Sequence, residues 1–330
     1  MTEVLMRCPV CSSEKFSLKD KIFDDRYGEP NIYNLAQCEV CKHQATYPRL
    51  NELDLPSLYG NYYPRKNISA EEVAFEAAKI KKPFAKLLRW CNGTDNQGQY
   101  CVKSGELMLD VGCGSGTSLL EAKCMGAQAF GIEADPNVQS IAQSLDLTIH
   151  FGSIHDQPFN QLTFDLIIMN QVIEHLPDPD LALKILLERL RPTGRMILVF
   201  PNTNSLWRRI FGKKWIHWHI PYHLHHFDIK KFEKMIKNCG LETIHSRTIT
   251  PNVWTVMQLR AWRQTPQHGV PNSIWTVSKP TNNSKNVFYQ TKKSKSYLRF
   301  IVFIVLGLTN RILDTLGMGD SLLVELRKGK

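Results

Sequence analysis

The sequence predicts an α/β fold in which helices cover both faces of a mostly parallel sheet. From about residue 105 onward, short apolar runs alternate with amphipathic segments. This pattern is typical of strands that are buried on both faces and separated by helices. The stretch LMLDVGCGSG (107–116) then places three alternating glycines directly after an apolar run. Glycines at such a place let the backbone turn tightly and come close to a ligand.

The elements of this sheet are predicted one by one from the apolar pattern. We expect strands near 106–111, 128–133, 148–152, 165–170 and 195–200, and helices near 116–125, 137–145 and 179–190. Two later segments, 241–249 and 321–328, predict further strands. The nine-residue apolar run 300–308 is far shorter than the roughly 20 residues that span a bilayer, and we expect it to form a buried helix.

The segment that precedes the sheet predicts a helix over 69–90. Ser69 is a suitable N-cap, and Glu72 stands at the matching capping-box position. Pro83 should kink this helix or split it in two, because proline removes one backbone hydrogen bond and clashes with the preceding turn.

Charge is distributed unevenly along the chain. The net charge is +10, yet no acidic residue lies between Glu242 and Asp314, a stretch that holds ten basic residues. Such a segment suits an anionic partner, either a lipid headgroup or a phosphorylated substrate, and a solvated face is the alternative. Peripheral contact of residues 277–313 with a membrane is therefore one expectation.

Four cysteines have the spacing of a metal site. Cys8, Cys11, Cys38 and Cys41 form two Cys-x-x-Cys pairs separated by 26 residues. Four thiolates fill a tetrahedral zinc site and leave no open position, so a structural zinc ion is expected. Because these cysteines suit a metal and no secretory signal opens the chain, we expect a cytoplasmic protein. Cys113 is expected to be an inert packing residue.

The glycine stretch and two later segments resemble a known family. Asp110 to Gly116 reads D-x-G-x-G-x-G, which resembles motif I of class I S-adenosylmethionine-dependent methyltransferases. Glu133 ends a strand about 20 residues later, where a carboxylate can bind both ribose hydroxyls. FDLIIMNQVIEHLPDP (164–179) resembles the fourth-strand motif of the same family. The resemblance implies a Rossmann-like sheet with one antiparallel strand, and S-adenosylmethionine as cofactor.

The same resemblance implies a set of cofactor-binding residues. At the position where the family often has an acid, this chain has Ser153, and Ser153, its backbone or Asp156 would take that role. The implied cofactor-binding residues are Asp110, Gly112, Cys113, Gly114, Gly116, Glu133, Ser153, Asn170 and Gln171.

A zinc ribbon ahead of this fold is similar to two methyltransferase groups, the zinc-containing sugar C-methyltransferases and a group of ribosomal RNA guanine methyltransferases. The stretch LYGNYYP (58–64) resembles the tyrosine-rich linker of the sugar group, which implies that Tyr59, Tyr62 and Tyr63 reach over the cofactor and substrate. Sugar- and polysaccharide-directed enzymes therefore provide the nearest resemblance. This chain is shorter than those C-methyltransferases, so O-methylation is at least as well supported as C-methylation.

A histidine cluster follows the fifth strand. WIHWHIPYHLHHF (215–227) holds five histidines, and its P-x-H-x-x-x-F part resembles a motif of sugar-directed methyltransferases. Transfer to a hydroxyl needs a base, and histidine titrates near neutrality. We favour His223 as this base, then His226, with Tyr222 or His175 assisting. Pro221 should break the helix that would align His219 with His223, so a second metal site is not expected there.

These observations divide the chain and suggest its function. The predicted parts are a zinc ribbon (1–50), a helical linker or cap (51–104), a cofactor-binding core (105–250), and a basic and apolar insertion with the final strand (251–330). The predicted function is methyl transfer to a sugar- or glycan-related, anionic small molecule. Alternatives are a quinone-like or secondary-metabolite acceptor, an RNA acceptor, which is less favoured, and a non-catalytic zinc-ribbon binding module.

Overall fold

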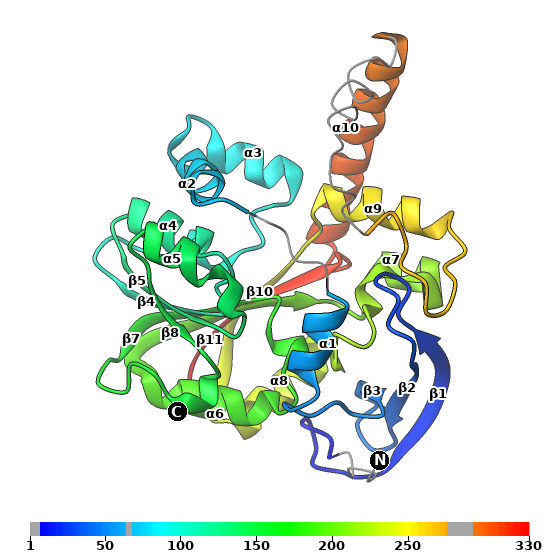
Figure 1. Cartoon of the computed structure of the whole chain (residues 1–330), viewed down its shortest axis with the longest axis horizontal. Coiled ribbons are helices and arrows are strands. Elements are labelled where there is room, and N and C mark those ends of the chain that lie inside the picture. Colours follow the sequence, from blue (N-terminus) through cyan, green and yellow to red (C-terminus); the bar gives the residue numbers. More distant parts are fainter. Residues whose placement is uncertain (1–6, 64–67, 276–292, 330) are drawn as a thin grey trace.

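A seven-stranded sheet forms the centre of the molecule (Figure 1). The computed structural model describes residues 7–63, 68–275 and 293–329, without the side chains of 293–303. The strand order is β10-β11-β8-β7-β4-β5-β6, and β11 runs antiparallel to both of its neighbours. The strands are β4 (Leu107–Val111), β5 (Gln128–Glu133), β6 (Thr148–Phe151), β7 (Phe164–Asn170), β8 (Leu190–Pro201), β10 (Leu241–Ile249) and β11 (Ser321–Lys328). This order confirms the predicted Rossmann-like methyltransferase sheet with one antiparallel strand.

Helices cover both faces of this sheet, as the alternating pattern predicted. On one face, α6 and α8 contribute Leu183, Leu186 and Phe232 to the larger apolar core. On the other face, α4 contributes Leu119 and Ala122 to a second core. The bounds are α4 (Thr117–Cys124), α5 (Gln139–Ser144), α6 (Pro179–Arg189) and α8 (Ile229–Asn238). The central strands are therefore buried from both sides, which explains their nearly continuous apolar sequences.

A second, four-stranded sheet is built mainly from the N-terminal segment. Its strands are β1 (Phe16–Phe23), β2 (Ile32–Cys38), β3 (Gln44–Tyr47) and β9 (His225–His226), in the order β1-β2-β3-β9. The fourth strand comes from the predicted histidine cluster, because Gln44 pairs with His226 and Ala45 with His225. The N-terminal segment is thus joined by backbone hydrogen bonds to a loop that follows β8.

The linker helices match the prediction from capping and proline. Ser69 and Glu72 form the expected capping box at the start of α2. The helix then stops before Pro83, so the expected single element is divided into α2 and α3. The bounds are α1 (Leu55–Asn61), α2 (Ala70–Ala78), η1 (Lys79–Lys81), α3 (Ala85–Asn92) and η2 (Gly98–Cys101).

Short helical turns follow several strands at the edge that carries the glycines, and two longer helices lie near the end of the chain. The remaining elements are η3 (Pro136–Val138), η4 (Ile154–Asp156), η5 (Ile173–His175), α7 (Leu206–Phe211), η6 (Gly212–Lys214), η7 (Ile216–Trp218), α9 (Asn252–Trp262) and α10 (Lys293–Thr315). In Figure 1, α10 projects away from the body of the molecule, with α9 at its base.

The expectation that 300–308 forms a buried helix is wrong in part. The run does lie in α10, but Ile304, Val305 and Leu308 are exposed, and Gly307 is its one buried residue among 304–308. Among the described side chains of α10, Asn310 and Arg311 are buried while Ile304, Leu308 and Ile312 are exposed, so one side of this part of the helix packs against the body. No helix among the described residues is long and apolar enough to cross a membrane. The part of the segment 277–313 that precedes residue 293 lies outside the described residues.

Candidate active site

The glycine loop lies where β4 ends and α4 begins. Gly112, Gly114 and Gly116 all have positive φ angles, of 74°, 54° and 83°. A Cβ on Gly112 would lie 2.5 Å from Cγ2 of Val172, and one on Gly116 would lie 2.3 Å from Cδ1 of Leu147. A Cβ on Gly114 would meet no heavy atom within 4 Å. Gly114 therefore faces open space, and an S-adenosylmethionine molecule beside this loop would find the backbone accessible.

Glu133 lies at the carboxyl end of β5, next to the glycine loop. Its carboxylate accepts hydrogen bonds from the backbone N–H of Gly114, at 2.7 Å, and of Asp135, at 2.8 Å. These bonds fix the carboxylate at the edge of the sheet, where a ligand binds in open α/β folds. The position suits the predicted contact with ribose hydroxyls.

Asp110 and Cys113 lie beneath the loop. Asp110 is 2 % exposed, and its carboxylate accepts a hydrogen bond from the hydroxyl of Ser118 in α4. Burial raises the pKa of Asp110 to about 7. Burial likewise raises the pKa of the Cys113 thiol above its ordinary range, so the thiol stays protonated. Both side chains hold the loop against the first turn of α4.

Asn170 and Gln171 end β7 beside the glycine loop. The Asn170 side chain accepts from the backbone N–H of Gly98, at 2.7 Å, and donates to Gln99 Oε1, at 3.0 Å. Gln99 is 1 % exposed and donates to Glu121 at 2.8 Å. The turn η2 therefore forms one wall of the cofactor edge. The sequence interpretation did not include Gln99, because no motif singled out this part of the linker.

Ser153 and Asp156 form a capping box at η4, beyond β6. The backbone N–H of Ser153 donates to Asp156 at 2.8 Å, and His150 Nε2 lies 2.9 Å from the same carboxylate. These hydrogen bonds lower the pKa of Asp156, with the His150 bond as the largest cause. Which of the two residues contacts a cofactor stays a prediction.

Three of the four predicted catalytic residues gather next to this edge. His175 Nδ1 lies 2.9 Å from the backbone oxygen of Tyr222 and 2.9 Å from the Tyr59 hydroxyl. His223 Nδ1 lies 2.9 Å from the backbone oxygen of His217. A carbonyl oxygen only accepts, so each Nδ1 carries the proton and each Nε2 is an acceptor.

Glu174 is buried beside these histidines. It is 1 % exposed, and neither carboxylate oxygen has a hydrogen-bond partner among the described residues. Its Oε1 lies 4.0 Å from Nε2 of His223. Burial raises the pKa of Glu174 to about 8 and lowers the pKa of His175 to about 4 and that of His223 well below its ordinary value. The ligand atoms of Glu174, His175 and His223 lie within 4.8 Å of one another, so this group could hold a cation or a polar acceptor group.

His226 and His219 depart from the sequence interpretation in different ways. His226 Nε2 lies 3.4 Å from Thr46 Oγ1, and its ring packs on Trp218, so it belongs to the β3–β9 pair rather than to the group around Glu174. His219 Nδ1 lies 3.3 Å from Nε2 of His223. No helix spans His219 to His223, as Pro221 predicted, but the irregular loop brings the two rings together without one.

Aromatic rings from three separate segments enclose this group. Tyr27 lies in the β1–β2 loop, Tyr59 and Tyr63 lie in or just after α1, and Tyr222 lies in the histidine loop. Tyr222 lies 5.5 Å from Tyr27, 5.4 Å from Tyr59 and 5.2 Å from Tyr63, measured between ring centroids. The sequence interpretation included Tyr59 and Tyr63 but missed Tyr27, because no local signal connects the β1–β2 loop with the sheet edge.

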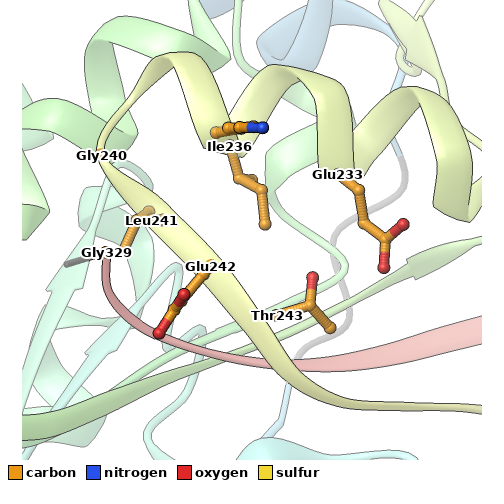
Figure 2. Close-up of a pocket in the computed structure, with 8 residues that line it drawn as sticks. Glu233, Ile236, Gly240, Leu241, Glu242, Thr243 and Gly329 are labelled. Atoms are coloured by element: carbon orange, nitrogen blue, oxygen red, sulfur yellow. The ribbon is translucent and has the colours of Figure 1, made fainter.

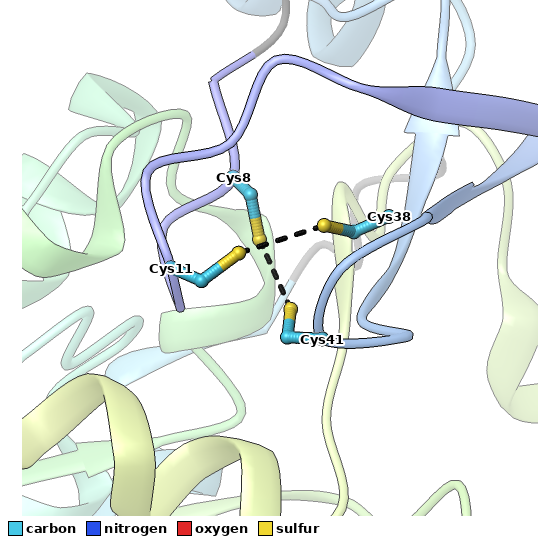
Figure 3. Close-up of side chains that lie close together, drawn as sticks. All are labelled: Cys8, Cys11, Cys38 and Cys41. Atoms are coloured by element: carbon cyan, nitrogen blue, oxygen red, sulfur yellow. Dashed lines mark hydrogen bonds between the residues drawn. The ribbon is translucent and has the colours of Figure 1, made fainter.

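The four predicted metal ligands are close together (Figure 3). The sulfur atoms of Cys8 and Cys41 lie 3.5 Å apart, and those of Cys11 and Cys38 lie 3.6 Å apart. A tetrahedral zinc ion with Zn–S bonds of about 2.3 Å requires sulfur atoms roughly 3.8 Å apart. All four sulfurs lie within 4.8 Å of one another and point to a common centre, so the residues fit a zinc ion.

A separate surface groove lies far from this chemistry (Figure 2). It runs between α8, the start of β10 and Gly329. Leu241, at the start of β10, pairs with Lys328. Ile249, at the other end of β10, pairs with Ser321, and Ser321 pairs with Pro201 at the end of β8. The end of β10 therefore lies on the same side as the end of β8, and its start lies on the opposite side. The groove therefore lies at the edge of the sheet opposite to the glycine loop. Its lining residues are Glu233, Ile236, Lys237, Gly240, Leu241, Glu242, Thr243 and Gly329.

Comparison with known proteins assigns a domain to the central part of the chain. Residues 85–246 match the family described as "Methyltransferase domain". The chain is 31 % identical over 150 residues to the chloroplastic tocopherol O-methyltransferase of Arabidopsis thaliana, which covers 43 % of this chain and 42 % of the relative. It is 26 % identical over 152 residues to the ubiquinone biosynthesis O-methyltransferase of Xanthomonas axonopodis pv. citri, which covers 42 % of this chain and 64 % of the relative.

A solved S-adenosylmethionine-dependent methyltransferase of Mesorhizobium loti is also similar, with a TM-score of 0.44 and 13 % identity over 73 % of this chain and 97 % of that chain. The matches to the two curated relatives span less than two thirds of each relative's length. Residues 85–246 thus match a methyltransferase domain, and this match contains every strand of the large sheet except β11 and the end of β10.

Proposed function

We propose that the methyltransferase domain transfers a methyl group from S-adenosylmethionine to a hydroxyl of a sugar- or glycan-related small molecule. The observation that carries this proposal is the unprotonated Nε2 of His223, which lies 3.3 Å from Nδ1 of His219 and 4.0 Å from the unpartnered Oε1 of Glu174. Both groups lie next to the edge of the sheet that carries the glycine loop, and tyrosine rings enclose them. Such a group suits the activation of a hydroxyl that is held out of bulk water.

The cofactor would be held by the glycine loop, by Glu133 at the ribose, and by Asn170 and Gln171 at the methionine end. When bound, S-adenosylmethionine supplies a methyl group on an activated sulfonium. The chain's task is then to align an acceptor oxygen with that methyl group and to take up its proton. The open space in front of Gly114 and the fixed carboxylate of Glu133 support this assignment.

His223 would accept the proton of the acceptor hydroxyl at Nε2. Its Nδ1–H is held by the backbone oxygen of His217, which fixes both the tautomer and the ring orientation. Because its pKa is lowered by burial, His223 is neutral at pH 7, and the acceptor must lie against Nε2 for this weakened base to take its proton. Glu174, whose Oε1 lies 4.0 Å away, is protonated at pH 7 because burial raises its pKa to about 8, and it would act as a neutral polar contact beside the imidazolium that forms. His175 and the Tyr222 ring would hold the acceptor in place.

We also propose that Cys8, Cys11, Cys38 and Cys41 bind a structural zinc ion. The sulfur separations support a tetrahedral site with no open position. The second Cys-x-x-Cys pair lies directly before β3, whose Thr46 donates from its hydroxyl to the backbone oxygen of His223. A zinc ion here would therefore fix the strand on which the histidine loop rests.

A second acceptor class is favoured by the relatives. The two curated relatives are named as tocopherol and ubiquinone biosynthesis O-methyltransferases. The four tyrosine rings around His223 would stack on a planar phenol or quinol as well as on a sugar ring. A phenolic hydroxyl would use the same base and the same alignment.

The test begins with calorimetric titration of the purified protein with S-adenosylmethionine and, separately, with NAD. We expect micromolar binding of S-adenosylmethionine and no binding of NAD. Release of S-adenosylhomocysteine is then measured with nucleotide-linked sugars and with quinols as acceptors. Turnover of sugars alone supports the proposed acceptor, whereas turnover of quinols alone favours the second class. Absence of cofactor binding would leave a non-catalytic zinc-ribbon module as the remaining interpretation.

A further inference from the structure

Three helices are joined into one projecting unit by buried polar contacts. Arg311 of α10 donates to the backbone oxygen of Trp90 in α3 at 2.7 Å. Asn310, which is fully buried, donates to Asn252 of α9 at 3.0 Å, and Asn252 donates to the backbone oxygen of Cys91 at 3.0 Å. The positions of α3, α9 and α10 relative to one another are therefore fixed by hydrogen bonds. Figure 1 shows α10 extending outward from this unit.

The outer side of this unit is strongly apolar. On α10, Ile304, Leu308 and Ile312 follow one another at intervals of four residues, so they lie on one side of the helix, and Leu316 follows directly after its end. Leu308 and Ile312 are each 60 % exposed. At α3, Phe84, Leu87, Leu88 and Trp90 are all at least half exposed. We call these eight residues the apolar helix surface. Soluble monomers rarely expose so many large apolar side chains together.

The charges next to the apolar helix surface are mainly positive. Lys81, Lys82 and Lys86 are exposed in the turn before α3 and in α3 itself. Asp95 is paired with Arg247 at 3.1 Å and Asp314 with Arg311 at 2.8 Å. The exposed acids of the neighbouring α2 are Glu71, Glu72 and Glu76, and Glu76 is paired with Lys79. Lys81, Lys82 and Lys86 form no ion pair among the described residues, so they place positive charge beside the exposed apolar side chains.

We propose that the apolar helix surface docks onto the surface of an anionic lipid bilayer. Helices that lie in the plane of a membrane interface combine apolar side chains, which enter the acyl boundary, with lysines, which meet lipid phosphates. Trp90 adds a side chain that is favoured at that depth. Charge complementarity favours this partner over a second copy of the chain, because a second copy would bring the same lysines together.

Docking in this orientation brings the catalytic edge close to the lipid. The segment that follows α3 leads within a few residues to Gly98, whose N–H donates to Asn170 at the end of β7. A membrane-bound α3 is therefore connected to the cofactor edge by a short, hydrogen-bonded stretch. The docking inference rests on the exposed surface alone and does not depend on the proposed methyl transfer.

The test is co-sedimentation of the full chain with vesicles. Vesicles of phosphatidylcholine and phosphatidylglycerol in equal parts are compared with vesicles of phosphatidylcholine alone, at low salt and at 0.5 M NaCl. We expect binding to the anionic vesicles that weakens at high salt, because screening shortens the reach of the lysines. The double variants Leu308→Glu/Ile312→Glu and Leu87→Glu/Leu88→Glu should each weaken binding at least tenfold.

A control matched in charge is Leu53→Glu/Leu181→Glu, which changes two exposed leucines elsewhere on the molecule. This control should bind vesicles as the unaltered chain does. Every variant should keep its affinity for S-adenosylmethionine, and that titration separates a failure of docking from a failure of the proposed function. The proposal is overturned if the unaltered chain ignores anionic vesicles, or if the helix variants bind like the control. It is also overturned if sedimentation shows a dimer that the same variants dissociate.

Discussion

The two halves of the candidate active site are built in opposite ways. The cofactor half comes from neighbouring parallel strands: the glycine loop after β4, Glu133 at the end of β5 and Asn170 at the end of β7. The acceptor half is assembled from the β1–β2 loop, α1, η5 and the histidine loop, which are far apart in the sequence. We therefore expect cofactor binding to depend on one sheet, and acceptor binding to depend on contacts between separate units.

Removal of the zinc site should give the largest difference between the two halves, because it should disturb the acceptor half and leave the cofactor half nearly unchanged. Cys38→Ser should abolish zinc binding, and zinc in small ribbon-type sites contributes on the order of 10 kcal/mol to folding. Hydrogen exchange should then speed up in β3 and in the histidine loop, because Thr46 is bonded to His223 and Leu224. The affinity for S-adenosylmethionine should change less than threefold. Cys124→Ser, which alters an exposed cysteine, should change neither quantity.

Gly114→Val should abolish cofactor binding and leave the acceptor half intact. The branched side chain would be strained at a φ of 54° and would fill the open space before the loop. We expect a loss of at least about 100-fold in affinity by calorimetry, or about 3 kcal/mol. Gly105→Val is the matched control, since Gly105 has a φ of 83° and equally open surroundings. Equal losses for both variants would show that strain, rather than ligand space, is responsible.

His223→Ala should have the converse effect. We expect turnover of the acceptor found by screening to fall by about 10²- to 10⁴-fold, the usual range for loss of a general base. Cofactor affinity should stay unchanged. His245→Ala, which alters an exposed histidine on β10, should have no effect on turnover. Unchanged turnover of His223→Ala would remove His223 as the base and direct attention to His175.

Acid should weaken the contact between the small sheet and the histidine loop, which includes His225. Burial lowers the pKa of His225 to about 4, whereas an unfolded histidine titrates near 6.5. The stability that His225 contributes is therefore complete above pH 6.5 and is lost as the pH falls from 6.5 toward 4. The free energy of unfolding, measured with urea, should be about 2 kcal/mol lower at pH 5 than at pH 7 because of this residue. His225→Asn should reduce that difference between the two pH values, and an unchanged difference would contradict the assignment.

Tyr59→Phe should give the smallest effect. It removes the hydroxyl that lies 2.9 Å from His175 Nδ1, but it leaves the carbonyl of Tyr222 in place to orient the same ring. Loss of one such hydrogen bond is worth about 0.5–1.5 kcal/mol, so turnover should fall about three- to tenfold. Tyr62→Phe, at the end of α1, is the control. A larger loss would indicate that Tyr59 contacts the acceptor directly.

The same difference between the halves explains what the sequence could predict. The strands of the large sheet, the capping box at Ser69 and the break at Pro83 follow from local patterns, and all are present. The glycine loop and Glu133 follow from spacing along two adjacent strands. Tyr27 and the β3–β9 pair could not be predicted, because they depend on how the N-terminal unit docks. The exposed side of α10 was missed because an apolar run does not by itself reveal what covers it.

The order in which the strands of the small sheet occur in the chain has a consequence for biosynthesis. Three strands of that sheet are complete by Tyr47, but the fourth, β9, is about 180 residues further along. At 5–20 residues per second, a ribosome needs roughly 10–35 s to deliver it. During that interval β3 carries an unpaired edge, which is exposed to pairing with other nascent chains. A fragment cut after residue 50 would keep that open edge permanently, so the N-terminal unit is not a module that can be transplanted alone.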